Sequence, residues 1–364
     1  MSPTTRVFTF GGEHMRFEFA FETDEGAIPF TFVAKSQHDY TITPSYKWFF
    51  EKEPLILDSG RILSNIRVGY HTYGTLNAEK DNAILVCHAL TGTSAVHRWW
   101  ADMFGEGKTL DPTKHFIVCS NVLGGCSGTS GPKEIGLDPI TIHDMVRVQK
   151  ELIKDLGIKK LTVIGGSMGG MQALEWVRSY PECLKKAIIV GAPPRHSAWA
   201  KSFNVSQRNA ITSDPEWKGG RYSEQPHGLA IARQIAMISY RSPESYQMTQ
   251  GGQSKFKPGQ SAIQTYLEYH GEKLLKRFDA NTYLLITQAM DLFEVTEDEL
   301  RRNTVPTLVV GISTDILYPA SEVREMAAHL SNSEYWQLES PHGHDAFLIE
   351  DEALNQRMLE FLGQ

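Results

Sequence analysis

The sequence predicts an α/β protein in which a mostly parallel sheet has helices on both faces and carries a helical lid insertion. The first observation is an alternation, beginning at about residue 50, of short apolar segments with longer segments of helical character. Strands that are apolar throughout are typical of parallel sheets, because both faces of such a sheet are buried. The second observation is a break in this alternation between about residues 193 and 303, which indicates an insertion.

Length and composition are those of a globular enzyme. At 364 residues the chain exceeds the roughly 250 to 300 residues that usually fold around one core, so we expect a large domain with an insertion, or two domains. The formal net charge is −7 and Lys and Arg form no basic stripe, which argues against nucleic acid as a partner. Nowhere do 18 apolar residues run together, and the N-terminus lacks the pattern of a leader peptide. We therefore expect a cytoplasmic protein with no membrane partner.

The four cysteines show no spacing typical of a metal site or a redox pair. They are Cys87, Cys119, Cys126 and Cys183. Because Cys87 and Cys119 lie within or at the end of apolar segments, the pattern predicts buried free thiols, as in a reducing compartment. Neither a bound metal nor a bound cofactor is expected.

Residues 1–45 precede the alternation and are expected to form an N-terminal extension. There, Phe17, Phe19 and Phe21 alternate with polar residues, which predicts a half-buried strand and, for the extension, a β-hairpin. Residues 46–192 and 304–364 then form the expected core domain. Its expected strands cover residues 66–70, 83–87, 116–120, 161–164, 187–190, 307–311 and 335–338. Helices are expected at residues 142–156, at 171–180 and from 346 onward.

Residues 193–303 are expected to form a helical lid domain. The segment is rich in helical stretches and is interrupted at Pro215, Pro226 and Pro258 as well as at several glycines. Open α/β sheets bind ligands beyond the carboxyl ends of their strands. An insertion between two such strands therefore predicts a roof over the site.

The most informative motif is Gly165–Gly170, in which glycines flank Ser167 on both sides. The motif follows the apolar segment 161–164 and precedes a helical stretch, as in a nucleophile elbow, where a sharp turn between strand and helix exposes the serine hydroxyl. Small neighbours let the backbone take such a turn. The pattern itself is common by chance, and a glycine-rich turn that serves packing alone is the alternative. The flanking strand and helix favour Ser167 as a catalytic nucleophile.

A catalytic serine needs a base that takes its proton and an acid that orients the base, here in the chain order serine, acid, histidine. Asp315 follows the expected strand 307–311, and His344 lies in the loop after the strand 335–338. We therefore predict Asp315 as the acid and His344 as the base. The alternative for Asp315 is a turn or helix-cap residue. His342 is the rival base, which we interpret as an ordinary loop residue.

An acyl intermediate also requires hydrogen-bond donors for the oxyanion that develops during attack. In this kind of site one donor is the backbone N–H that follows the nucleophile, which is that of Met168. The second comes from the loop after an early strand, and we predict the N–H of Leu90 within the segment 88–92.

Several separate motifs of the chain, in the right order, closely resemble the homoserine O-acetyltransferase family. They are Thr72–Leu76, His88–Gly92, Ser120–Cys126, Gly165–Glu175 and Gly343–Phe347. Three lid segments are similar as well, namely Gly271–Lys273, Arg277–Asn281 and Ala289–Asp291. The resemblance extends from about residue 50 to the C-terminus.

The resemblance implies an α/β-hydrolase fold with a helical lid, often dimeric through the lid helices. It implies an enzyme that moves an acetyl group from acetyl-CoA, its co-substrate, to the side-chain hydroxyl of L-homoserine, a reaction of methionine biosynthesis. Ser167 would be acetylated, CoA would leave, and the homoserine hydroxyl would attack with His344 as base. Arg233 would bind the carboxylate of the amino acid and Asp345 its ammonium group.

The residue chemistry is compatible with these roles. Arg233, Met237 and Tyr240 are spaced by four and three residues, so on one helix they share a face and can line a pocket. A guanidinium fork suits a carboxylate, although a surface ion pair is the alternative for Arg233.

The acceptor and the donor are less firmly indicated than the chemistry. The segment Arg195–Trp199 is similar to members of the wider family that use serine or other hydroxyl acceptors. A succinyl donor is an alternative to acetyl. An esterase with the same triad is a further alternative, as is a non-catalytic binding protein that keeps the fold.

Overall fold

The computed structural model describes residues 4–8, 14–23, 26–35 and 44–363, and its contacts divide into two units, Met1–Thr43 and Pro44–Gln364. The first unit contains the strands β1 (Thr4–Phe8), β2 (His14–Thr23) and β3 (Gly26–Lys35). They pair antiparallel in the order β1-β2-β3. The sequence predicted a β-hairpin for this part of the chain, and the strands described there pair as a three-stranded sheet.

The second unit is built on a sheet of eight strands in the order β13-β12-β11-β10-β8-β9-β7-β4. The strands are β4 (Ser45–Phe49), β7 (Ile66–Tyr73), β8 (Ala83–Cys87), β9 (Phe116–Ser120), β10 (Leu161–Gly166), β11 (Leu184–Val190), β12 (Thr307–Ile312) and β13 (Ser333–Leu338). Neighbours from β9 to β13 pair parallel, whereas β7 and β4 are antiparallel at one edge. A short hairpin, β5 (Leu55–Ile56) and β6 (Ile62–Leu63), lies between β4 and β7 in the chain. The predicted fold class, a mostly parallel α/β sheet, is confirmed.

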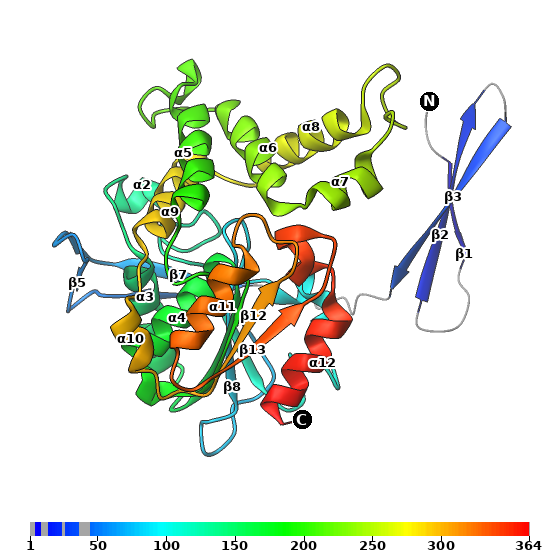
Figure 1. The fold of residues 1–364 in the computed structure, drawn as a ribbon. Coiled ribbons are helices and arrows are strands. Elements are labelled where there is room, and N and C mark those ends of the chain that lie inside the picture. The colour runs from blue at the N-terminus through cyan, green and yellow to red at the C-terminus, as the bar shows by residue number, and fades with distance from the viewer. Residues whose placement is uncertain (1–3, 9–13, 24–25, 36–43, 364) are drawn as a thin grey trace. The chain divides into compact units, whose positions relative to one another are not determined.

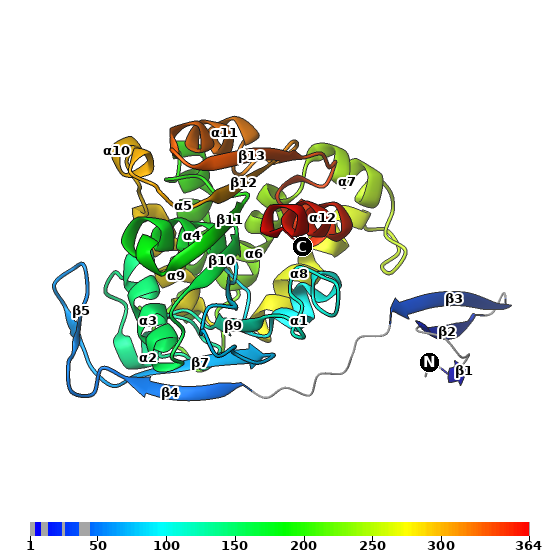
Figure 2. The same cartoon turned by 90° about the horizontal axis from the view of Figure 1, so that it is seen from below.

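Helices cover both faces of this sheet, as Figure 2 shows. On one face lie α3 (Ile142–Asp155), α4 (Met168–Ser179) and α11 (Ala320–His329); on the other lie α1 (Val96–Trp99) and α12 (Asp351–Leu362). Because both faces are covered, every residue of β8, β10 and β12 is buried. This double burial explains why these strands read as continuous apolar segments in the sequence.

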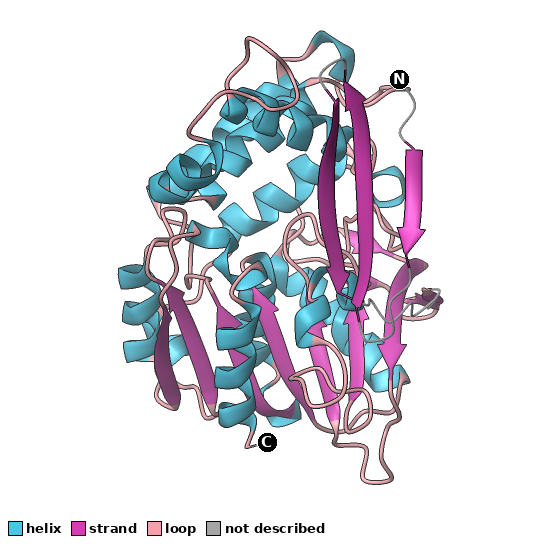
Figure 3. Cartoon of the chain, turned by 90° about the vertical axis from the view of Figure 1, so that its right-hand side faces the viewer, coloured by secondary structure: helices cyan, strands magenta, loops and turns pink. Residues whose placement is uncertain are grey.

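The range expected to form a lid contains the helices α5 (Ala198–Thr212), α6 (Gly228–Tyr240), α7 (Pro243–Gln250), α8 (Ala262–Leu275) and α9 (Ala280–Leu292), which we refer to as the lid. They form a helical layer beyond one end of the sheet (Figures 1 and 3). The lid touches the core at several loops: Trp199 donates a hydrogen bond to the carbonyl of Ile316, and Arg277 donates one to the carbonyl of Thr91. The expected lid range 193–303 also includes α10 (Glu297–Arg301), which packs against α11 of the core.

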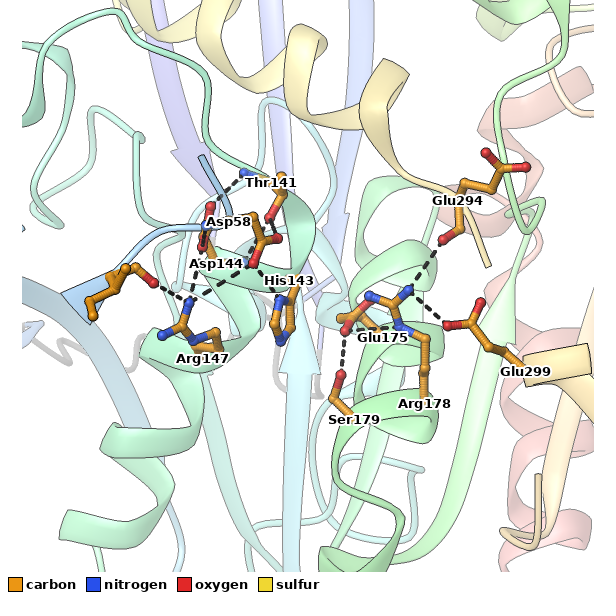
Figure 4. A network of polar contacts seen from close by, with 11 residues as sticks. Asp58, Thr141, His143, Asp144, Arg147, Glu175, Arg178, Ser179, Glu294 and Glu299 are labelled. Atoms are coloured by element: carbon orange, nitrogen blue, oxygen red, sulfur yellow. Dashed lines mark hydrogen bonds and ion pairs between the residues drawn. The ribbon is translucent and has the colours of Figure 1, made fainter. Parts of the chain in front are cut away.

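Helix α4, which follows Ser167, is anchored at its C-terminal end (Figure 4). Glu175 is fully buried there and forms an ion pair with Arg178 at 2.8 Å. Burial raises the pKa of the Glu175 carboxyl, against the opposing effects of Arg178 and Ser179. Arg178 also donates to the carbonyl of Glu294 and meets the carboxylate of Glu299. These contacts fix α4 against the segment that returns from the lid.

A second polar cluster in Figure 4 holds the start of α3. Thr141 caps the helix by accepting from the Asp144 N–H at 3.0 Å, and the Asp144 carboxylate accepts from the Thr141 N–H in return. Such a reciprocal cap satisfies N–H groups that a helix start otherwise leaves unpaired. Asp58 binds the same cap through His143 and through its own N–H to Asp144. The cap therefore also fixes the hairpin loop that precedes β7.

Three sequence expectations need correction. Helix α4 begins at Met168 rather than at 171, because Gly169 and Gly170 lie inside its first turn despite their low helix propensity. The segment expected to start a helix at 346 is a 3-10 turn, Gly343–Leu348, followed by α12. Of the four cysteines, all of them free thiols, Cys126 is exposed rather than buried, since it lies in a loop after β9.

Within the described residues, no helix is both long and apolar enough to cross a membrane. The same part of the chain groups no three His, Cys, Asp or Glu side chains in a way that suits a metal ion.

Candidate active site

Ser167 occupies the turn between β10 and α4 in a strained conformation, with φ 57° and ψ −126°. A side-chain-bearing residue in such a sparsely populated region costs on the order of 1–3 kcal/mol. Two glycines make the turn possible: a Cβ on Gly165 would lie 2.0 Å from the Gly169 carbonyl oxygen, and one on Gly169 would lie 2.0 Å from the Cys87 carbonyl oxygen. The structure thus holds the serine on an elbow whose backbone packs directly against the end of β8.

Asp315 and His344 lie side by side in buried surroundings. The Nδ1 atom of His344 is 2.6 Å from Oδ2 of Asp315. The other carboxylate oxygen, Oδ1, accepts from the N–H groups of Leu317 and Tyr318 at 2.8 and 2.9 Å. The carboxylate is therefore fixed by its own loop, and its second oxygen orients the imidazole.

The loops that carry these two residues are bound to each other. Thr314 donates its hydroxyl to the Ser340 carbonyl at 2.6 Å and accepts from the Gly343 N–H at 3.0 Å. Gly343 has φ 68°, and a Cβ there would lie 2.5 Å from the Ser242 nitrogen of the lid. A glycine is required at this point because the lid backbone approaches so closely.

The pKa of His344 is raised above its usual value of 6.5. Burial acts to lower the pKa, but the charge and the hydrogen bond of Asp315 outweigh it, and the charge of Asp345 adds to them. The Nε2 atom of His344 is buried and has no hydrogen-bond partner in the described part of the chain. This nitrogen is thus available to accept a proton.

Ser167 and His344 share neighbours, which places both at one site. The Ser167 N–H donates to the Val190 carbonyl, and the next residue, Gly191, faces the His344 ring. The ring of Tyr318 contacts the His344 ring at 5.0 Å between centroids.

Phe347, in the loop that carries His344, contacts both the elbow and the His344 ring. Its ring packs on Gly166, the residue before the serine, and lies 5.6 Å from the His344 ring between centroids. The elbow and the histidine loop are therefore in direct contact.

His342, the rival base, faces away from this group. Its Nδ1 atom lies 3.2 Å from the Ser245 hydroxyl of the lid helix α7. No contact of His342 with Ser167 or Asp315 occurs among the described residues. The structure thus brings His344, and not His342, to the serine and the acid.

The two expected oxyanion donors lie on adjoining segments. The Met168 N–H is the first of α4 and has no acceptor within the helix, and in the described ranges the Leu90 N–H has no backbone acceptor. Gln172 of α4 donates to the His88 carbonyl at 3.2 Å, which holds the Leu90 loop on the helix start. His88 itself accepts from the Val122 N–H at 3.2 Å, and burial lowers its pKa to about 4, so it acts as a neutral spacer.

Arg233 and Tyr240 share a face of α6, as their spacing predicts. The Arg233 guanidinium carbon lies 5.4 Å from the Tyr240 ring centroid, and that ring lies 5.8 Å from the His344 ring. Among the described residues no carboxylate lies within ion-pair distance of Arg233, so its guanidinium fork is open to a ligand. A cation beside His344 can bind a small anion there.

Asp345 follows His344 directly and faces the same side. Its carboxylate lies 3.1 Å from Nε of Arg241, which follows Tyr240 at the end of α6. Burial raises the pKa of Asp345, although Arg241 and Arg233 both act to lower it. A guanidinium and a carboxylate near His344 suit the two charged ends of an amino acid.

Sequence reasoning missed Tyr318 and Arg241. Tyr318 is 1% exposed and its ring contacts His344, but a single tyrosine in a loop carries no periodic signal. Arg241 stands next to Tyr240 in the chain, and its relation to Asp345 depends on how the lid packs on the histidine loop. Only the proximity of Tyr318 to Asp315 in the chain hinted that it belongs to the site.

Comparisons with known proteins agree with this geometry. Residues 82–351 match the family described as alpha/beta hydrolase fold. The homoserine O-acetyltransferase of Deinococcus radiodurans is 50% identical over 318 residues, which cover 86% of this chain and 91% of that protein. The solved homoserine O-acetyltransferase from Bacillus anthracis has a TM-score of 0.81 at 26% identity, covering 89% of this chain and 98% of that one. Esterase E22 has a TM-score of 0.78 at 25% identity, covering 88% of this chain and all of that one.

Transferases and an esterase thus share the fold, so the fold alone does not separate them. Sequence identity separates them, since half of the residues aligned with the Deinococcus radiodurans homoserine O-acetyltransferase are identical over most of both chains. The family resemblance noted in the sequence is confirmed. This chain belongs to the homoserine O-acetyltransferase family, within the alpha/beta hydrolase fold.

Proposed function

We propose that the protein transfers an acetyl group from acetyl-CoA to the side-chain hydroxyl of L-homoserine through an acetyl ester on Ser167. The observation that carries this proposal is the combination of a serine on a nucleophile elbow, a histidine with a free Nε2, and an unpaired guanidinium beside them. Family membership supports the choice of donor and acceptor. Acetyl-CoA is consumed and CoA is released in each cycle, so it acts as a co-substrate and not as a bound cofactor.

In the first half-reaction, His344 Nε2 takes the hydroxyl proton as Ser167 attacks the thioester carbonyl. The new oxyanion is stabilised by the N–H groups of Met168 and Leu90. When the tetrahedral intermediate collapses, the carbon–sulfur bond breaks, the CoA thiolate leaves, and His344 returns its proton to the sulfur. Asp315 stabilises the imidazolium that exists between these two steps, because its carboxylate is fixed at Nδ1.

The second half-reaction uses the same groups in the opposite direction. The homoserine hydroxyl gives its proton to His344 and attacks the ester carbonyl, and Ser167 leaves with the proton. Arg233 binds the carboxylate of homoserine, with charge-assisted hydrogen bonds worth about 1.5–3 kcal/mol each. Asp345 binds its ammonium group, in place of part of its contact with Arg241. Tyr240 lines the pocket between them.

Hydrolysis is the main rival, since water can attack the same ester, and a related esterase has the same fold. The lid favours transfer, because it shields the ester from water. Two narrower rivals keep the transfer but change a substrate, namely serine as acceptor and succinyl-CoA as donor. Serine and succinyl-CoA differ from homoserine and acetyl-CoA in chain length and terminal charge, not in the chemistry at Ser167.

Product analysis tests the proposal. The enzyme is incubated with acetyl-CoA or succinyl-CoA, each with homoserine, serine or no acceptor, and free CoA and acylated amino acid are measured. We expect O-acetylhomoserine as the main product and slow CoA release without acceptor. CoA release at the full rate without an acceptor would show that the protein is a hydrolase. Preferential acylation of serine would show that serine, and not homoserine, is the acceptor.

We further propose a homodimer that forms through the lid. Large apolar side chains are exposed on α6, α7 and α8, namely Ile231, Ile238, Met248 and Tyr269. Their exposed fractions range from 37% for Ile231 to 63% for Met248, which is more than a monomer needs on neighbouring helices. Sedimentation of the wild type and of Ile238→Asp tests this, and a monomeric wild type would refute it.

A further inference from the structure

A chain of buried polar side chains leads to the two segments that carry the expected oxyanion donors, namely the loop 88–92 and the first turn of α4. It consists of Trp176 and Gln172 on α4 and of Gln149 on α3. Their exposed fractions are 0%, 0% and 2%. Nε1 of Trp176 lies 2.8 Å from Oε1 of Gln149, and Nε2 of Gln149 lies 2.8 Å from Oε1 of Gln172. Because Gln172 and Trp176 are four residues apart, they share a face of α4 and Gln149 bridges them.

The indole of Trp176 fixes the direction of these hydrogen bonds. An indole N–H can only donate, so the oxygen of the Gln149 amide faces Trp176. The NH2 group of Gln149 is then turned to Gln172 and donates to its amide oxygen. In consequence the NH2 group of Gln172, and not its oxygen, faces the loop 88–92 and the first turn of α4.

The Gln172 amide joins these two segments. Its Nε2 atom donates to the carbonyl of His88 and to the carbonyl of Met168, each at 3.2 Å. The two N–H groups that we expect to bind the oxyanion belong to the same segments, since they are those of Met168 itself and of Leu90, two residues after His88. One buried NH2 group thus connects the backbone on either side of the expected oxyanion hole.

The side chain of His88 holds the loop 88–92 from its other side. Its Nδ1 atom donates to the Ala89 carbonyl at 2.8 Å, and its Nε2 atom accepts from the Val122 N–H at 3.2 Å. Burial lowers the pKa of His88 to about 4, so the ring is neutral and can donate from one nitrogen and accept at the other. The carbonyl and the ring of His88 are therefore both held, which limits the movement of the Leu90 N–H.

We propose that Gln172 and Gln149 are positioning residues for the oxyanion hole. Gln172 sets the spacing of the two donor N–H groups by holding the His88 and Met168 carbonyls together, and Gln149 fixes the orientation of the Gln172 amide. The inference rests on the proposed acyl transfer through Ser167. Buried amides cost free energy unless every polar atom has a partner. An oxyanion hole gives such a network a use, because its donors must lie roughly 2.7–3.1 Å from the oxyanion without reorganising during the reaction.

The test uses a readout that depends on the carbonyl oxygen of the acyl donor. p-Nitrophenyl acetate and its thiono analogue, in which sulfur replaces the carbonyl oxygen, both acylate Ser167 and release p-nitrophenolate. The oxygen gains the full stabilisation of the oxyanion hole, whereas sulfur is a weak acceptor and gains little. The ratio of kcat/KM for the two esters therefore measures the oxyanion hole, while loosening of the protein elsewhere slows both esters alike. The KM for homoserine and the unfolding temperature are measured alongside.

We expect Gln172→Met, which keeps the length of the side chain but removes its donors, to lower the oxygen-to-sulfur ratio about tenfold. Gln149→Met lowers the ratio by a smaller factor, because the Gln172 amide then loses only the partner that orients it. The double variant has the same ratio as Gln172→Met, since Gln149 acts through Gln172. The KM for homoserine stays unchanged in all three variants.

Gln207→Met is the matched control. Gln207 is also 2% exposed, and its amide oxygen accepts from the Tyr283 hydroxyl at 2.8 Å, but both residues lie in the lid. This variant loses a buried amide as well, so its unfolding temperature falls. Its oxygen-to-sulfur ratio equals that of the wild type.

An unchanged ratio in folded Gln172→Met would overturn the inference, and so would an equal fall of the ratio in Gln207→Met. Losses that multiply in the double variant would contradict the path from Gln149 to Gln172. If Gln172→Met does not fold, Gln149→Met decides, and an unchanged ratio in that variant overturns the inference. Failure of the proposed function is distinguishable, since a wild-type enzyme that releases p-nitrophenolate without acylation of Ser167 would remove Ser167 itself from the chemistry.

Discussion

Nδ1 of His344 lies 2.6 Å from Oδ2 of Asp315, and this contact leaves the opposite nitrogen of the ring, Nε2, buried without a partner among the described residues. One side of the imidazole is therefore fixed by a charge, while the other side is free to take a proton. Ser167 lies close by, since the neighbouring Gly166 packs on Phe347, whose ring contacts His344, and Gly191 faces the His344 ring. The consequences for pH dependence, substrate binding and stability can each be measured.

In the proposed mechanism, acetylation of Ser167 requires a neutral His344. Because Asp315 and Asp345 raise the pKa of His344 above 6.5, a larger part of the enzyme is protonated and inactive at neutral pH than for a free imidazole. We expect kcat/KM for acetyl-CoA to fall, as pH decreases, through a pKa above 6.5. Asp345→Asn removes one of the charges that raise the pKa of His344. The fall of kcat/KM on the acid side, the acid limb of the pH profile, should therefore move to lower pH.

His342→Gln is the control for that titration, since His342 faces α7 and should leave the limb in place. An acid limb that stays unchanged in Asp345→Asn would contradict the assignment of the titrating group.

The raised pKa of His344 also affects stability. A pKa that is raised on folding stabilises the protein below 6.5, and this contribution is lost as pH rises through the folded-state pKa.

Replacing Arg233 separates binding from chemistry. Arg233→Met keeps much of the side-chain volume but removes the cation that we assign to the homoserine carboxylate. We expect the KM for homoserine to rise about 10- to 150-fold, from a loss of roughly 1.5–3 kcal/mol. The acetylation of Ser167 by acetyl-CoA alone should keep its rate.

Arg324→Met is a matched control for Arg233→Met. Arg324 also lies over a tyrosine ring, 5.0 Å from the centroid of Tyr335, but on α11 of the core. Steady-state kinetics should be unchanged in this variant. An unchanged KM for homoserine in Arg233→Met would show that the carboxylate binds elsewhere.

The elbow gives a prediction on stability. A methyl group on Gly169 would lie 2.0 Å from the Cys87 carbonyl oxygen, and backbone cannot yield there as a flexible side chain would. We expect Gly169→Ala to lower the free energy of unfolding by about 1–3 kcal/mol or more, and to reduce activity with it. Urea unfolding measures the change. Gly252→Ala, where a Cβ meets no atom within 4 Å, should be neutral, and equal midpoints for the two variants would refute the packing argument.

The sequence was sufficient for much of the fold because the central strands are buried on both faces. β8, β10 and β12 are apolar except for Thr162 and Thr307, so the sequence predicted them as strands of a parallel sheet. The edge strand β4 was not predicted, since its residues are mostly exposed and show no apolar pattern. The start of α4 was misplaced because helix propensity disfavours Gly169, whereas tertiary packing decides its conformation.

The residues of the candidate site also fall into those that the sequence predicts and those that it does not. Ser167, Asp315 and His344 each follow a strand, so their common location at one end of the sheet followed from topology. The contacts made by the lid did not follow, because they depend on how separate helices pack. The pairing of Arg241 with Asp345 and the hydrogen bonds of His196 with Asp291 and Tyr318 belong to this second group.

The proposed mechanism requires an acetyl ester at Ser167, and mass spectrometry of the intact enzyme tests for this ester directly. Wild-type enzyme mixed with acetyl-CoA alone should gain one acetyl group, mapped to the peptide that contains Ser167, and should lose it on addition of homoserine. Ser167→Ala should gain none, and its turnover should fall by about 10⁶. An enzyme that forms O-acetylhomoserine without ever carrying the acetyl group, or a Ser167→Ala variant that keeps most of its activity, would contradict the central claim.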